Sequence, residues 1–337
     1  MPNQYNERLY DWNEIKDEHQ WSGILLGNGA SIAIWDNFRY SSIFDRAASS
    51  DYVENPLGER EIDLFEEINT TNFEQILSSL ATARVVNQAL GVESPDIDVI
   101  YEGVQRALVE AVRSVHIAWG LVSNETLLRI REELLNYSFV YSTNYDLLVY
   151  WAIMATPSGE GFKDYLWDGV FDPGDTEIWE KSTKVLYIHG GLHLYRTEYG
   201  NTLKRRARNS ENLLDLFGQP CRDGAVPLFV TEGDSRQKLN SIYRSDYLSF
   251  AYSKFSNHEG DLIIFGHSLG ESDSHLFSLN DSWKGRRIAI SLRPGRERTL
   301  RRKKANAKRI FPESYLVFFD SETHPLGLPD LKIHEPD

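Results

Sequence analysis

The segment Phe139-Val140-Tyr141-Ser142-Thr143-Asn144-Tyr145-Asp146 decides how the chain is organised. Its first three residues are aromatic or β-branched, which predicts a short buried strand. The next two are good helix caps, and the apolar run from Tyr145 predicts a helix. Asn144 and Asp146 therefore stand where a strand passes into a helix, at the edge where open α/β sheets bind ligands. The same residues also suit an ordinary helix cap, with Asp146 in the positive first turn.

A second strand-to-helix transition lies at Gly27-Asn28-Gly29-Ala30-Ser31. Residues 24–26 predict a buried strand, the glycines predict a tight turn, and Ser31 is expected to start a helix. Such a turn can present backbone N–H groups to a phosphate, because glycine lacks the Cβ that would block an anion. A lone Gly-x-Gly is also common without a ligand, so both interpretations stay open here. Arg39 is either a partner of the same phosphate or a surface arginine.

Further apolar runs predict the remaining strands of a sheet. They are residues 185–188, 261–265, 287–292 and 315–319. Strands that alternate with helical segments are typical of a parallel sheet. We therefore expect an α/β fold, a Rossmann-like parallel sheet with helices on both faces. The prediction is one domain over residues 1–337, with a mainly helical insertion at about 45–137 and a mixed insertion at about 192–258. An irregular loop at 156–181 is expected to form a lid or a pocket wall.

Composition excludes several classes of function. The net charge of −14 argues against a nucleic-acid binder held mainly by phosphate contacts. A single cysteine, Cys221, allows no intrachain disulfide and no cysteine-based zinc site. No apolar run reaches membrane-spanning length, and the first residues lack the pattern of a signal peptide. A cytoplasmic protein is therefore expected. The basic run 296–309 suits a solvated helix face, and it also suits contact with an acidic partner.

One interpretation of the late motifs is a serine hydrolase. Gly266-His267-Ser268-Leu269-Gly270 matches Gly-x-Ser-x-Gly after a buried strand, which is the context of a nucleophile elbow. Asp320 and His324 follow Ser268 in the order of a Ser-Asp-His triad, and His189-Gly190-Gly191 could supply oxyanion-hole amides.

Two observations count against the hydrolase. The elbow is followed by Glu271, Ser272 and Asp273 rather than by the small residues that let an elbow helix pack closely. The hydrolase also leaves the glycine turn at 27–29 and the turn at Asn144 without a role.

The four strand ends taken together resemble the sirtuin-like NAD-consuming family, which includes bacterial NAD hydrolases of antiphage defence. Residues 27–31 resemble its Gly-Ala-Gly-x-Ser phosphate loop, with Asn28 in place of the usual Ala. Residues 142–146 resemble its Thr-x-Asn-x-Asp motif, in the Asn-Tyr-Asp form of the defence branch. His189-Gly190 resembles the catalytic His-Gly, and Gly266-His267-Ser268-Leu269 resembles the late Gly-x-Ser-Leu. The closest match is an uncharacterised, zinc-free sirtuin-like branch, because the four zinc-binding cysteines of true sirtuins are absent.

The resemblance implies that NAD⁺ is the substrate and that water cleaves its nicotinamide–ribose bond without a metal. His189 is then the general base, Asn144 holds ribose hydroxyls or the attacking water, and Asp146 orients the carboxamide or stabilises the cationic sugar. The pyrophosphate would lie on the amides of residues 29–31. The expected NAD-binding residues are Gly27, Asn28, Gly29, Ala30, Ser31, Arg39, Thr143, Gly266, Ser268 and Leu269.

The biological role implied by the resemblance is an antiphage effector that depletes NAD. It would act as a homo-oligomer or together with a partner defence protein. A third hypothesis is a sensor that binds NAD or a related nucleotide without turnover.

Overall fold

The fold is taken from a computed structural model. It describes residues 8–156, 160–166, 168–175, 182–197, 199–205, 213, 226–231, 233–278 and 283–335. Cys221 lies outside these residues, as do residues 157–159, 167 and 176–181 of the loop expected at 156–181.

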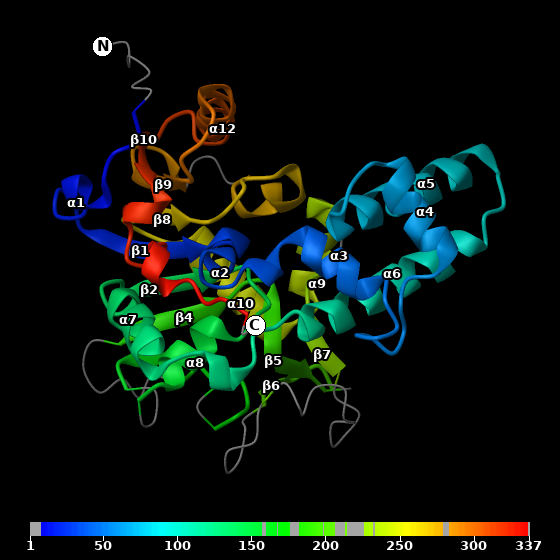
Figure 1. Cartoon of the computed structure of the whole chain (residues 1–337), viewed down its shortest axis with the longest axis horizontal. Helices are drawn as coiled ribbons and strands as arrows, with labels where there is room; N and C mark the ends of the chain where they lie inside the picture. The colour runs from blue at the N-terminus through cyan, green and yellow to red at the C-terminus, as the bar shows by residue number, and fades with distance from the viewer. Residues whose placement is uncertain are drawn as a thin grey trace.

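The central element is a seven-stranded sheet in which every pair of neighbouring strands is parallel (Figure 1). The strand order is β10-β9-β8-β1-β2-β4-β3. The strands are β1 Trp21–Leu26, β2 Phe139–Ser142, β3 Phe162–Lys163, β4 Thr183–Tyr187, β8 Asp261–Phe265, β9 Arg287–Leu292 and β10 Tyr315–Asp320. With helices flanking this sheet, the expected Rossmann-like α/β fold is confirmed.

A small antiparallel sheet follows β4, in the order β6-β5-β7. It contains β5 Gly190–Arg196, β6 Thr202–Lys204 and β7 Val226–Phe229.

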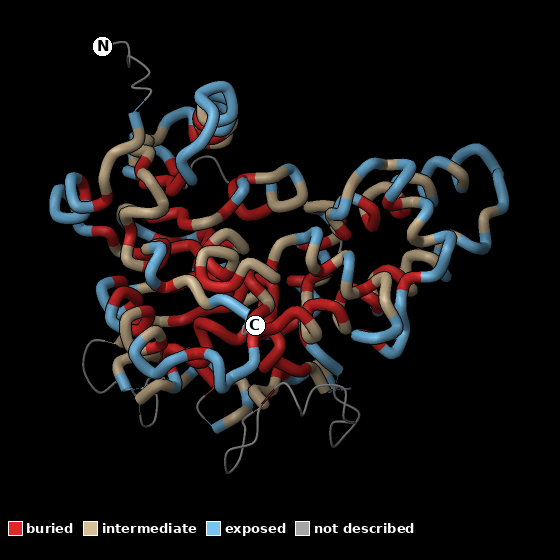
Figure 2. Tube along the Cα trace, viewed as in Figure 1, coloured by how far each residue is buried: buried red, intermediate tan, exposed pale blue. Residues whose placement is uncertain are grey.

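The described α-helices are α1 Trp12–Ile15, α2 Asn28–Ile34, α3 Tyr40–Ala47, α4 Glu59–Glu67, α5 Phe73–Leu90, α6 Asp96–Ser114, α7 Asn124–Leu134, α8 Leu148–Met154, α9 Ser235–Tyr243, α10 Asp246–Ser256 and α12 Glu297–Ile310. Helices α4, α5 and α6 extend away from the sheet, and the outer part of this group is largely exposed (Figures 1 and 2). The first turn of α5 lies in the interior, because Phe73, Ile76 and Leu77 are fully buried. None of the described helices is long and apolar enough to cross a lipid bilayer.

Four neighbouring strands end at the same level of the sheet. Leu26 at the end of β1 is the register partner of Ser142 in β2 and of Phe265 in β8. Ser142 in turn is the register partner of Tyr187 in β4. Because all these strands are parallel, the residues that follow their carboxyl ends meet at one edge of the sheet.

The start of α2 differs from the expectation. The helix begins at Asn28, with Gly27 as its N-cap, rather than at Ser31. The tight turn is therefore shorter than predicted. Gly27 has an extended backbone (φ −107°, ψ 176°), so strand β1 passes into the helix through this single residue.

Strand β5 carries a buried histidine without polar contacts. The His193 ring is fully buried, stacks on Tyr150 and contacts the ring of Tyr187. Neither of its nitrogens has a hydrogen-bond partner among the described residues. Burial, together with the Lys204 ammonium, lowers the pKa of His193 from 6.5 to about 3. The folded chain therefore keeps this ring neutral.

We predict that His193→Phe removes part of the acid sensitivity of the fold. Between pH 6.5 and about 3 the unfolded chain binds a proton at this histidine that the folded chain does not. The wild-type free energy of unfolding should therefore fall with decreasing pH by about 1.4 kcal/mol per unit more than that of the variant. Urea unfolding at several pH values measures both slopes. His334→Phe, at an exposed histidine, is the control, and equal slopes for wild type and His193→Phe would contradict the prediction.

Candidate functional site

Two adjoining cavities open at the edge where the four strands end. The larger has a volume of about 570 Å³ and the smaller about 220 Å³. Both are lined by Gly29, Ile32 and residues 266–268, so the loop after β8 and the first turn of α2 form their shared wall. They lie next to each other at the topological switch of the sheet, where β1 lies between β8 and β2.

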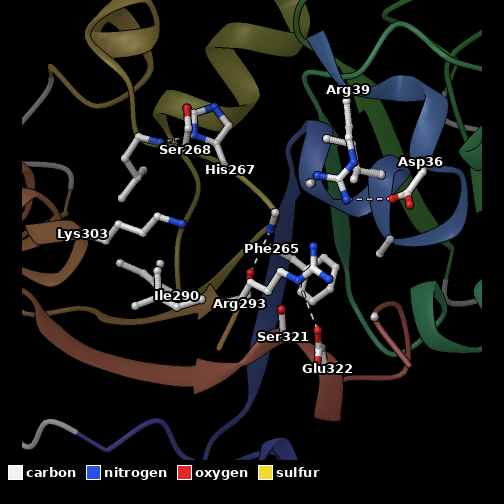
Figure 3. Close-up of a pocket in the computed structure, with 18 of the residues that line it drawn as sticks. Asp36, Arg39, Phe265, His267, Ser268, Ile290, Arg293, Lys303, Ser321 and Glu322 are labelled. Atoms are coloured by element: carbon white, nitrogen blue, oxygen red, sulfur yellow. Dashed lines mark hydrogen bonds and ion pairs between the residues drawn. The ribbon is translucent and has the colours of Figure 1, made fainter. Parts of the chain in front are cut away.

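The larger cavity carries an excess of positive charge. Its charged lining residues are Arg39, Arg293, Lys303 and Lys332, with the carboxylates of Asp36 and Glu322. Arg39 and Lys332 both pair with Asp36, and Arg293 pairs with Glu322. Figure 3 shows the Lys303 side chain extending from α12 into the cavity, across from these pairs.

The smaller cavity carries the opposite charge. Three carboxylates line it, those of Glu74, Asp146 and Asp273. The ammonium group of Lys238 offsets part of this charge, because it lies 2.8 Å from both Glu74 and Asp273. The walls therefore suit an anionic group in the larger cavity and a cationic group in the smaller one.

The glycines of the β1–α2 turn serve close backbone packing. A Cβ on Gly29 would lie 2.7 Å from the carbonyl oxygen of Gly266, and a Cβ on Gly27 would lie 2.5 Å from the Cα of His267. Gly266 itself has φ +68°, and a Cβ there would meet the Ala30 nitrogen at 2.3 Å. These three positions need glycine because the two loops touch backbone to backbone.

This packing corrects the expected phosphate cradle on the amides of residues 29–31. The Gly29 amide donates to the Gly266 carbonyl at 2.8 Å, and the Ala30 amide donates to the Gly27 carbonyl at 2.9 Å. Two of the three expected donors are therefore already used within the protein. Of the predicted loop, Asn28 and Gly29 line a cavity, whereas Gly27, Ala30 and Ser31 are not among the described lining residues.

Asn144 lines the smaller cavity, and one atom of its amide lacks a hydrogen-bond partner among the described residues. Its Nδ2 donates to the Gly27 carbonyl at 3.1 Å and to Ser31 Oγ at 2.8 Å, which fixes the orientation of the amide. The Oδ1 atom is buried and has no partner among the described residues. Buried acceptors are normally satisfied, so a hydroxyl or water donor in the cavity would complete this side chain.

Ser31 links the first loop to Asp146. Its hydroxyl donates to Asp146 Oδ2 at 2.5 Å, while Asp146 Oδ1 accepts from the Leu148 amide at 2.9 Å. The adjoining Leu147 amide donates to His116 Nε2 at 2.8 Å. Each oxygen of Asp146 therefore accepts a hydrogen bond from the protein, which fixes the carboxylate in the lining of the smaller cavity.

His189 follows β4 and lines the same cavity as Asn144. It is buried, and its Nε2 lies 3.1 Å from Nε2 of His275. Burial, together with the nearby Lys238 ammonium, lowers the pKa of His189 well below 6.5. The imidazole is therefore neutral near pH 7 and can accept a proton.

Lys238 joins three distant parts of the chain behind His189. It lies on α9 and its side chain is 0 % exposed, whereas Glu74 lies on α5 and Asp273 on the 3₁₀ helix η5 (Glu271–Leu276). Burial alone would lower the pKa of Lys238, but the two carboxylates raise it, so the side chain stays charged. Its charge in turn holds the pKa of Asp273 well below its usual range, although burial opposes this.

The residues of the predicted serine hydrolase have other contacts. His324 is fully buried; its Nε2 lies 3.4 Å from both Glu133 and the Tyr137 hydroxyl, and its Nδ1 accepts from the Leu326 amide. Asp320 accepts from the Glu322 amide as a helix cap. Ser268 is exposed in the shared wall of the two cavities. Both nitrogens of His324 are thus engaged away from Ser268.

The other residues predicted to bind NAD line one or both of the cavities. Thr143, Gly266 and Ser268 line the smaller cavity, and Arg39, Gly266, Ser268 and Leu269 line the larger one.

Several groups at the site had not been predicted from the sequence as functional residues. These are Tyr40, Glu74, Lys238, His267, Asp273 and His275. Asp273 and His275 lie within ten residues of the end of β8, and this position in the sequence could have indicated that they belong to the site. Glu74 and Lys238 come from the two insertions, so only the folded structure brings them to the site.

Comparison with protein families gives a match over most of the chain. Residues 24–326 match the model of DUF4917, a domain of unknown function. No curated protein matches the sequence.

We predict that Lys238→Met strongly destabilises the fold. The change leaves the partly buried carboxylates of Glu74 and Asp273 without their ammonium partner, and breaking a buried ion pair costs about 3–5 kcal/mol. Urea unfolding measures the loss. The control is Lys284→Met, which breaks an exposed pair with Glu313 and should cost less than about 1 kcal/mol. A similar small effect of both variants would show that the buried network contributes little.

Proposed function

We propose that this chain, which belongs to the DUF4917 family, cleaves the nicotinamide–ribose bond of NAD⁺ with water. The observation that carries the proposal is the charge of the two adjoining cavities. NAD⁺ has an anionic pyrophosphate and a cationic pyridinium ring, and the walls have the complementary signs in the same order. The adenosine and pyrophosphate would occupy the larger cavity and the nicotinamide riboside the smaller one.

The carboxylates of the smaller cavity suit the reaction itself. As the C–N bond breaks, positive charge moves from the nicotinamide ring onto the ribose. At an effective dielectric constant of about 20, one carboxylate about 5 Å from such a charge contributes roughly 3 kcal/mol. Asp146, whose oxygens are held by Ser31 and Leu148, would act through this charge.

Asn144 and His189 would handle the attacking water. The unpaired Oδ1 of Asn144 would accept a hydrogen bond from the water or from a ribose hydroxyl. The water oxygen bonds to the ribose C1, the glycosidic electron pair leaves with neutral nicotinamide, and the proton passes to His189. His275, 3.1 Å from His189, would share that proton. General-base assistance of this kind is typically worth roughly 10²–10⁴-fold.

The pyrophosphate would then be held by side chains of the larger cavity rather than by the amides of residues 29 and 30. Arg39 and Lys303 lie on opposite sides of this cavity (Figure 3). Ser268, on the shared wall, would contact the adenosine ribose or a phosphate and would not act as a nucleophile.

For the biological role, we propose an antiphage effector that depletes NAD, acting as a homo-oligomer or with a partner defence protein. This follows from the resemblance of the four strand-end motifs to the sirtuin-like NAD hydrolases.

We predict that expression of the wild-type chain in bacteria lowers cellular NAD and releases nicotinamide. His189→Ala and Asn144→Ala should each abolish both effects, because they remove the proton acceptor and the group that positions water. Liquid chromatography of cell extracts measures NAD and nicotinamide, and circular dichroism checks the fold of each purified variant. Arg302→Gln, at an exposed residue that lines neither cavity, is the control and should remain active. Equal depletion by wild type and His189→Ala would contradict the mechanism, and saturable NAD⁺ binding without any turnover would favour a sensor.

We predict that Lys303→Gln raises KM for NAD⁺ about two- to fivefold with little change in kcat. An exposed cation near a phosphate typically contributes up to about 1 kcal/mol, and this contribution is weakened by salt. The control is Arg302→Gln, which removes an exposed charge from the same helix without touching either cavity. Steady-state kinetics at low and high salt should show a larger KM change at low salt. An equal effect of both substitutions would argue against a phosphate near Lys303.

A further inference from the structure

We propose that His189, Asp273 and His275 form a binding site for a divalent transition metal ion of the Zn²⁺ class. One ligand atom from each of the three residues lies within 4.8 Å of the others. The inference goes beyond the proposed NAD⁺ cleavage and does not depend on it. Metal binding at this position would compete with the role of His189 as proton acceptor.

The two imidazoles already have the separation that a metal requires. Their Nε2 atoms are 3.1 Å apart. Two ligands of a tetrahedral Zn²⁺, each at about 2.0–2.1 Å from the metal, are roughly 3.3 Å apart. The two ring nitrogens are therefore close to the separation that a shared metal ion requires.

The carboxylate of Asp273 is oriented by a second layer of contacts. The Leu269 amide donates to His267 Nδ1 at 3.0 Å, so His267 carries its proton on Nε2. That nitrogen lies 3.3 Å from Asp273 Oδ2, and Lys238 donates to Oδ1 at 2.8 Å. Hydrogen-bonded carboxylates of this kind are typical of metal ligands, because their partners fix the ligand geometry.

The charge around the three ligands tolerates a cation. Lys238 opposes a metal next to Asp273, but Glu74 neutralises the ammonium at 2.8 Å. Asp146 adds a further negative charge on the wall of the smaller cavity, and His189 and Asp273 line that same cavity. An ion can therefore enter from the cavity and meet a site with net negative charge.

The ligand types decide the class of metal. Two imidazole nitrogens and one carboxylate suit Zn²⁺, Co²⁺ and Ni²⁺ better than Mg²⁺ or Ca²⁺, which prefer oxygen ligands. Three protein ligands also leave at least one position open toward the cavity.

The test is a titration of the purified full chain with Co²⁺, in the absence of NAD⁺, followed by visible absorption. We expect one Co²⁺ per chain with an absorption band of four- or five-coordinate metal, displaced by Zn²⁺ and not by Mg²⁺. His275→Phe keeps the ring contacts with His189 and Tyr252 but removes both nitrogens. It should weaken Co²⁺ binding at least about tenfold. His334→Ala, at an exposed histidine, is the matched control and should bind as wild type does.

Circular dichroism verifies the fold of His275→Phe, and His275→Asn is the second variant should the first fail to fold. No saturable Co²⁺ binding, or equal binding by wild type and a folded His275 variant, would overturn the proposal. Because NAD⁺ is absent, neither result depends on whether the chain cleaves it.

Discussion

The parallel register of β8, β1, β2 and β4 is the constraint on which the site depends. Backbone hydrogen bonds place the last residues of these strands side by side, so four separate loops begin at one level. The loops therefore begin next to one another. The closest approach is between the turn at Gly27 and Gly29 and the loop at Gly266, where only glycine fits. This contact sets the wall that the two cavities share.

The buried ammonium of Lys238 is the second element that holds the site together. It connects the first insertion through Glu74 and the sheet edge through Asp273. In the low dielectric of the interior, both carboxylates are stable only while this partner is present. The insertions therefore contribute directly to the walls around His189, although their outer parts lie far from the sheet (Figure 1).

The sequence alone predicted the fold and the sheet edge at which the cavities lie, because short runs of apolar residues mark the strands and polar residues follow them. Residues 261–265 and 287–292 are strands with the predicted bounds, and the polar groups after β2 and β4 meet as expected. The predicted start of α2 was wrong, because Gly27 caps the helix without a side-chain hydrogen bond. The sequence pattern placed the helix start at Ser31, a residue type that commonly caps helices. The same glycines were interpreted as a phosphate cradle, although they mainly allow two backbones to touch. Glu74 and Lys238 could not be found, because their partners are 35 or more residues away in sequence.

The position of β1 has a consequence for synthesis of the protein. Its neighbour β8 is reached only late in the chain, as the contact between Ser22 and Asp261 spans 239 residues. At a translation rate of about 5–20 residues per second, roughly ten to fifty seconds pass before that partner emerges from the ribosome. During this time one edge of β1 is an unpaired apolar strand on a nascent chain, the kind of surface that chaperones bind and that aggregates when left uncovered.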